Sequence, residues 1–152
     1  MTLLEIISKI KAIGARQPNI HTILDDVYDL NTTNVEANYS AFCVQQNQHR
    51  MEGDFITYNF YLFYVDRLLS DKSNMVEIQS TGIQVLSNIV RTLDLETGLE
   101  VSTSTFQVFT QRFEAECAGV YLSVGVTVPF PDCANYMPDE NSFTDDYNKD
   151  YD

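Results

Sequence analysis

The chain has 152 residues, of which 44% are hydrophobic, 12% aromatic and 20% charged. This length predicts one domain, and the composition excludes both a disordered chain and a membrane span of about 20 consecutive apolar residues. The 22 Asp and Glu residues outnumber the 9 Lys and Arg residues, which gives a net charge of -13. A surface this acidic repels phosphate, so groove binding on DNA or RNA is disfavoured.

The cysteines and the N-terminal residues give information on the cellular compartment of the protein. Cys43, Cys117 and Cys133 are odd in number and form no C-x-x-C pair, which favours a reduced intracellular compartment over a disulfide framework. Charged side chains at Glu5 and Lys9 interrupt the apolar residues at the N-terminus, so we expect no secretory signal peptide.

The N-terminal segment has the pattern of an amphipathic helix. Thr2 and Glu5 have the spacing of a capping box, and apolar residues then recur every three or four positions up to Gly14, a candidate C-cap. After the breaker Pro18, residues 21–30 mix β-branched and aromatic residues with three aspartates, and we interpret them as a strand.

Two aromatic and β-branched segments, 39–50 and 54–66, flank residues 51–53 and predict a β-hairpin with a short glycine-containing turn. Successive side chains of a strand point to opposite faces. We expect the core to receive the wholly apolar or aromatic face, which holds Ile56, Tyr58, Phe60, Leu62 and Tyr64. The other face is more mixed, and we expect it to be partly solvated or covered by another chain.

Residues 74–93 predict a long amphipathic helix. Asn74 is a candidate N-cap, and residues 94–98 contain the glycine that ends the pattern. Gly82 costs a helix interior roughly 1 kcal/mol relative to alanine, so it indicates a close approach to a neighbouring backbone.

Two further strands are predicted at 101–113 and 120–128, joined by residues 114–119. The order of elements predicts an α+β fold, with two helices packed on one face of a mainly antiparallel sheet. We assign residues 1–130 to this domain and residues 131–152 to an extended, acidic, aromatic-containing C-terminal arm.

No constellation of residues predicts catalysis. His21 and His49 have no partner at zinc-ligand spacing and are interpreted as surface or sheet-edge residues. Two glutamates lie near Cys117 in the sequence, and their negative charge raises the pKa of a thiol, which disfavours a nucleophile. We interpret Cys43 as a small core residue. Phosphate-binding loops and G-x-S-x-G are absent from the sequence. We expect no catalytic residue, no cofactor and no metal site.

The last 15 residues, 138–152, contain six acidic residues and one lysine, so they carry -5 of the net -13. Phe143, Tyr147 and Tyr151 recur there every four residues, and aromatic side chains are the usual anchors of a docking segment. The pattern predicts an interaction arm, and a simple solubilising tail is the alternative. Residues 146–152 match only half of a calcium loop, which is weak evidence for a cation site.

Three segments carry a resemblance to a known family: FITYNFYLFYVDRLL, SNMVEIQSTGIQVLSNIVRTL and CAGVYLSVGVTVP. Together with the order of elements over residues 2–130, they resemble the tail-terminator and tail-completion fold of tailed-bacteriophage neck proteins. The middle segment is similar to ring proteins, or head-tail connectors, of crAss-like phages.

The resemblance implies a virion structural protein, not an enzyme, that forms a ring of six or twelve copies in the neck between portal and tail. The implied partners are other copies of the chain and the portal-side and tail-side phage proteins, with assembly in the host cytoplasm and no membrane. DNA would pass through the ring without specific binding, which suits an acidic wall. The candidate partner-binding residues are Tyr58, Tyr61, Phe63, Phe143, Tyr147 and Tyr151.

Other functions fit the same composition. A monomeric or dimeric α+β adaptor would bind proteins without forming a ring. A small enzyme would use Tyr58, Tyr61 or Tyr64 and a carboxylate, and it requires a deep pocket enclosing a carboxylate with a raised pKa. A DNA-mimic inhibitor is disfavoured, because a charge concentrated in the tail lacks the spacing of a duplex.

Overall fold

The computed structural model describes residues 1–31, 39–113 and 115–129. The helices are α1 (Leu3–Ala15), the 3-10 helix η1 (Val27–Asn31) and α2 (Met75–Thr97). The strands are β1 (Thr22–Leu24), β2 (Ala41–Gln46), β3 (Arg50–Glu52), β4 (Phe55–Arg67), β5 (Glu100–Thr103), β6 (Gln107–Arg112) and β7 (Glu116–Pro129).

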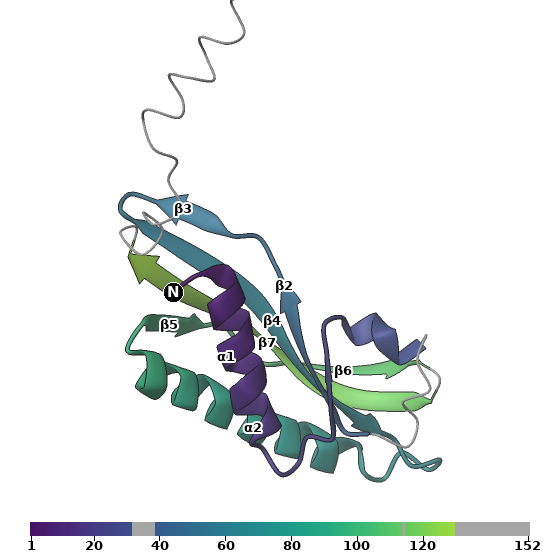
Figure 1. Ribbon diagram of the computed structural model, residues 1–152. Coiled ribbons are helices and arrows are strands. Elements are labelled where there is room, and N and C mark those ends of the chain that lie inside the picture. The colour runs from purple at the N-terminus through teal and green to yellow at the C-terminus, as the bar shows by residue number, and fades with distance from the viewer. Residues whose placement is uncertain (32–38, 114, 130–152) are drawn as a thin grey trace, which may run out of the picture.

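All seven strands of this described part form one sheet in the order β1-β2-β4-β7-β5, with β3 also paired to β4 and β6 to β7. The β1–β2 pair is parallel and the remaining pairs are antiparallel. Both α-helices contribute to the same core on one face of the sheet (Figure 1). The predicted α+β class is therefore confirmed, with a mixed sheet. The described helices include none with the length and apolar character of a membrane span.

Helix α1 begins as predicted and ends one residue later. The Glu5 amide donates to Thr2 Oγ1 at 3.2 Å, and the Thr2 amide donates to Glu5 Oε2 at 3.4 Å, which completes the capping box. Gly14 is not the C-cap, because the helix continues to Ala15. Gly14 instead makes room for Phe42, whose ring would lie 2.8 Å from an added Cβ.

The strand predicted over residues 21–30 is wrong in its second half. Strand β1 ends at Leu24, and η1 follows after two aspartates. Asp26 Oδ1 accepts a hydrogen bond from the Tyr28 amide at 3.0 Å. An aspartate side chain bonded two residues ahead satisfies the backbone as a turn does, so it competes with a sheet ladder.

The predicted hairpin is present, but its turn lies at Gly53 and Asp54, because Glu52 pairs with Phe55. Gly53 has φ 57°, a left-handed conformation that glycine adopts without strain. The first arm is interrupted at residues 47–49, where three residues oppose two of β4. This extra residue is a β-bulge, which bends the edge of the sheet.

Helix α2 begins where predicted but ends at Thr97, one turn beyond the predicted end. It stops at Gly98, which has φ 64° and donates its amide to the Asp94 carbonyl. Asn74 occupies the N-cap position without capping the helix through its side chain. That side chain accepts from the Leu69 amide at 2.9 Å and donates to the Arg67 carbonyl at 3.1 Å. Asn74 therefore ties the end of β4 to the start of α2.

The strand predicted over residues 101–113 is two strands, β5 and β6, which pair with different halves of β7. Between them, residues 104–106 oppose two residues of β7, which is a second bulge. The connector predicted at 114–119 is wrong, because β7 already begins at Glu116 and pairs there with Arg112.

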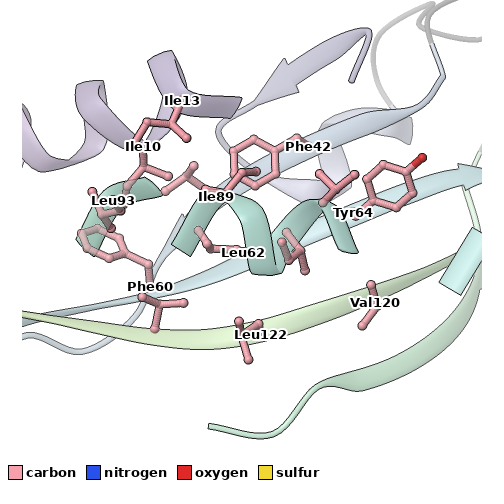
Figure 2. Close-up of a cluster of buried hydrophobic side chains, with 14 of the residues drawn as sticks. Ile10, Ile13, Phe42, Phe60, Leu62, Tyr64, Ile89, Leu93, Val120 and Leu122 are labelled. Atoms are coloured by element: carbon pink, nitrogen blue, oxygen red, sulfur yellow. The ribbon is translucent and has the colours of Figure 1, made fainter. Parts of the chain in front are cut away.

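The core lies between the two α-helices and the sheet (Figure 2). The labelled side chains come from α1, β2, β4, α2 and β7: Ile10, Ile13, Phe42, Phe60, Leu62, Tyr64, Ile89, Leu93, Val120 and Leu122. The predicted core face of β4 is confirmed. Gly82 does mark a close approach of the helix, but to side chains of the sheet and not to a backbone as predicted, since an added Cβ would lie 2.4 Å from Val120 Cγ1.

Candidate functional site

The face of the sheet opposite the α-helices carries a cluster of half-buried aromatic side chains. We call Tyr61, Phe63, Phe109 and Tyr121 the aromatic cluster. The ring centroids lie 5.2 Å apart for Phe63 and Tyr121, 5.9 Å for Tyr61 and Tyr121, and 6.1 Å for Phe63 and Phe109. Tilted and edge-on rings at these separations attract one another beyond their burial.

Strand register brings these residues together. On β4, Tyr61 and Phe63 alternate with the core residues, and Phe63 pairs directly with Tyr121 of β7. Phe109 of β6 pairs with Gly119. A Cβ at Gly119 would lie 2.8 Å from Phe109 Cζ and 2.2 Å from the Tyr64 carbonyl oxygen. The glycine therefore makes the space that Phe109 occupies beside Phe63.

Helix η1 covers one end of this face. It closes a second, smaller core whose buried members are Val27, Leu30, Ala41, Cys43, Val65, Phe113 and Cys117. Tyr28 of η1 remains 57% exposed, and its ring meets Phe113 edge-on at 6.2 Å. The aromatic cluster thus lies at the border between the covered and the open part of the face.

At this border the surface is hollowed by two cavities of about 170 and about 310 Å³, which we call the aromatic groove. Four residues line both cavities: Val27, Tyr28, Phe63 and Tyr121. The remaining lining residues are Gln45, Tyr61, Phe109, Gln111 and Phe113. None of these nine described side chains is charged, so the groove suits apolar or aromatic side chains.

Acidic residues lie near the groove on the η1 side. The pKa of the Cys43 thiol is raised to about 12, chiefly by burial and to a smaller extent by the nearby carboxylates of Asp26, Asp29 and Asp25. The pKa of the Cys117 thiol is also raised, chiefly by burial, with Glu116 contributing less. The sequence thus predicted the correct direction for Cys117 but named the smaller cause.

The structure separates the predicted partner-binding residues. Tyr61 and Phe63 lie in the aromatic cluster. Tyr58 lies on the helix side, packed against the main core, with its ring 5.4 Å from that of His49. Phe143, Tyr147 and Tyr151 lie outside the residues that the structure describes, and so does the cation pattern of residues 146–152.

Sequence reasoning missed Phe109, Tyr121 and Tyr28. Alternation along the last predicted strand places Tyr121 opposite the aliphatic face, but which residues lie beside Tyr121 depends on strand pairing. Phe109 was hidden because the bulge at 104–106 resets the alternation before β6. Tyr28 was placed in a strand and instead belongs to η1.

A separate polar pocket of about 300 Å³ lies on the helix side, between the first turns of α2 and the ends of β2 and β4. Its lining residues are Asn19, His21, Tyr39, Ser40, Tyr64, Asp66, Asn74, Glu77, Ile78 and Thr81. Burial raises the pKa of the Asp66 carboxyl, although the hydrogen bond from the Arg67 amide at 2.8 Å opposes this shift.

The polar pocket does not present an activated serine. The Ser40 hydroxyl donates to the Asn19 carbonyl, and His21 Nδ1 accepts from the Ser40 amide at 3.3 Å rather than from its hydroxyl. A nucleophilic serine needs a base at its hydroxyl. Across the described ranges no three His, Cys, Asp or Glu side chains are placed to hold a metal ion.

No protein-family model matches the chain, and no curated protein matches it in sequence. The functions of the aromatic groove and of the polar pocket are therefore inferred from their own residues.

Proposed function

We propose that this protein is a structural subunit that assembles with copies of itself into a ring in the neck of a tailed-bacteriophage virion. The observation that carries the proposal is the aromatic cluster, a set of half-exposed rings on the face of the sheet that neither α1 nor α2 covers. Three parts of the proposal rest on the resemblance to tail-terminator and ring proteins: the location in the neck, the portal-side and tail-side neighbours, and the number of six or twelve copies.

The chemistry of the open face suits contact between subunits. Interfaces are enriched in tyrosine and phenylalanine and depleted of charge at their centres, and the aromatic groove has this composition. The rings belong to paired strands, so ordering them on association costs little side-chain entropy. Copies that meet through two different surfaces form a closed ring when the rotation between them closes.

The net charge of -13 suits a ring that DNA crosses. An acidic channel wall repels the phosphate backbone and lets the duplex move without adhering. This part of the proposal fails if assembled rings bind duplex DNA tightly at low salt.

The experiment is a mass measurement by size-exclusion chromatography with light scattering. We expect the wild type to form a closed oligomer and Tyr61→Lys to weaken it, since a lost interface anchor costs about 2 kcal/mol or roughly 30-fold in affinity. Val76→Lys is the matched control, because Val76 is 70% exposed on α2 and the substitution adds the same charge. Circular dichroism checks that both variants stay folded.

Two results decide against the ring. A wild type that stays monomeric or dimeric at all concentrations points to an adaptor. If Tyr61→Lys and Val76→Lys lose assembly equally, the face that carries the aromatic cluster is excluded as the contact surface between copies.

The polar pocket favours a second candidate, a small enzyme. It encloses Tyr64 and Asp66, and the raised pKa of Asp66 is the property that such an enzyme requires. Because Ser40 lacks a base at its hydroxyl, this candidate is limited to acid–base chemistry by Asp66. Asp66→Asn tests it: a hydrolytic or isomerase activity that survives the substitution excludes the carboxyl as its catalyst.

A further inference from the structure

We propose that the aromatic groove is the receptor for the C-terminal residues 138–152 of a neighbouring copy. The inference rests on the proposed ring assembly and names the contact that joins one subunit to the next. The groove supplies an uncharged aromatic socket, and the segment supplies aromatic side chains at regular spacing.

The socket consists of two cavities with shared walls. Val27, Tyr28, Phe63 and Tyr121 line both, so two side chains from one segment could enter next to each other. The Tyr28 ring on η1 meets Phe113 edge-on and remains 57% exposed, so an inserted ring can stack against its exposed side.

The segment has the anchors that such a socket takes. Phe143, Tyr147 and Tyr151 follow one another at intervals of four residues. The acidic residues between them keep the segment soluble when it is undocked. Aromatic residues that insert into pockets dominate the affinity of most protein interfaces, whereas charged rim residues contribute little.

The direction of β7 favours a neighbouring copy over the same chain. Tyr121 in the groove lies eight residues before Pro129, where β7 ends, so the chain leaves the sheet about 26 Å beyond its own groove and pointing away from it. Phe143 lies 14 residues further on and reaches up to about 50 Å. A reach of about 50 Å exceeds the radius of gyration of about 14 Å expected for the folded body and is long enough for a neighbouring subunit, whereas docking in the chain's own groove would also require the segment to reverse direction.

The charges on both partners distinguish docking by aromatic burial from docking by charge attraction. The segment carries -5, and Asp26 and Asp29 are the sequence neighbours of the groove residues Val27 and Tyr28. Coulomb repulsion therefore opposes docking, and burial of the rings must drive it. Salt screens the repulsion and leaves the aromatic contact intact, so affinity should hold or rise between about 0.05 M and about 0.5 M salt.

The contact is tested by photo-cross-linking in the full-length protein. We expect Tyr147→p-benzoylphenylalanine to cross-link to residues of η1, β4, β6 or β7 in the groove, and the products to have the mass of two or more chains. The same amino acid placed at Val76, on the outer face of α2, is the control and should not reach the groove. Cross-links confined to single chains, or absent from the groove, overturn the proposal.

Measuring the assembly of two full-length variants distinguishes failure of this inference from failure of the proposed function. The full-length variant Phe143→Ser/Tyr147→Ser/Tyr151→Ser should weaken assembly at least tenfold, and the control Asp139→Asn/Asp145→Asn/Asp146→Asn should match or exceed the wild type. If the serine variant assembles as well as the wild type, the docking is wrong and the ring stands. If the wild type does not assemble, the ring is wrong and the docking between copies falls with it.

A synthetic peptide of residues 138–152 gives the third measurement. We expect it to bind the full-length serine variant, and Tyr28→Ser in that variant to weaken binding at least tenfold. Binding that is unaffected by Tyr28→Ser, or that falls as salt rises, shows that the acidic residues and not the rings make the contact, and it overturns the proposal.

Discussion

At Gly82, helix α2 packs on the sheet without space for a Cβ, and replacing this glycine with alanine measures how tightly the two layers fit. The added Cβ would lie 2.4 Å from Val120 Cγ1 and 2.8 Å from Tyr64 Cδ1, whereas carbon atoms in contact prefer about 3.5–4.0 Å. Val120 is fully buried and Tyr64 is 3% exposed, so neither side chain has free space to enter.

The expected loss of stability follows from two opposing effects. Overpacking a filled core costs about 1–3 kcal/mol, and an overlap with two buried neighbours belongs at the upper end of this range. Alanine regains about 1 kcal/mol over glycine through its helix propensity. Gly82→Ala should therefore lower the free energy of unfolding by about 2 kcal/mol, or the melting temperature by roughly 8 °C for a chain of this size.

Urea unfolding followed by circular dichroism measures this difference. The control is Ser80→Ala, an exposed position of the same helix, which should keep or slightly raise stability because only the propensity changes. A Gly82→Ala variant as stable as the wild type would mean that α2 and the sheet are not in the tight contact described above.

Three further predictions test other parts of the molecule. Hydrogen bonds from Arg16 to Glu96 lower the pKa of the Glu96 carboxyl to about 2. The stabilisation by this ion pair is therefore present above the ordinary pKa of 4.5 and is lost as the pH falls towards 2. The difference in urea midpoint between wild type and Glu96→Gln should shrink over that pH range. Because burial raises the pKa values of Cys43 and Cys117, a thiol reagent at pH about 8 should label at most one cysteine in the native protein and three after unfolding. Thr2→Ala should cost about 1 kcal/mol in thermal unfolding through loss of the capping box, and an unchanged midpoint would contradict the cap.

Features that depend on local periodicity could be predicted from the sequence. The core face of β4, the capping box of α1 and the close approach at Gly82 each follow from residues within one element. The two bulges could not be predicted, because an extra residue at 47–49 or 104–106 changes the pairing without changing the composition. At the start of η1 the Asp26 side chain accepts a hydrogen bond from the Tyr28 amide, and this bond competes with a sheet ladder that the same residues also favour.

The candidate site was predictable only in part for the same reason. Alternation placed Tyr61 and Phe63 on the open face, but their contact with Tyr121 required the register of β4 with β7. The polar pocket joins Ser40, Asp66 and the first turns of α2, which come together only through the fold.

Strand β4 carries the core on one side and the proposed interface on the other, in strict alternation. Inserting one residue in the middle of this strand would exchange the two sets beyond that point, moving Phe63 into the core and Tyr64 to the open face. The core face and the proposed interface are therefore encoded in the same thirteen residues. We therefore expect insertions and deletions within β4 to abolish function, even where substitutions on the open face are tolerated.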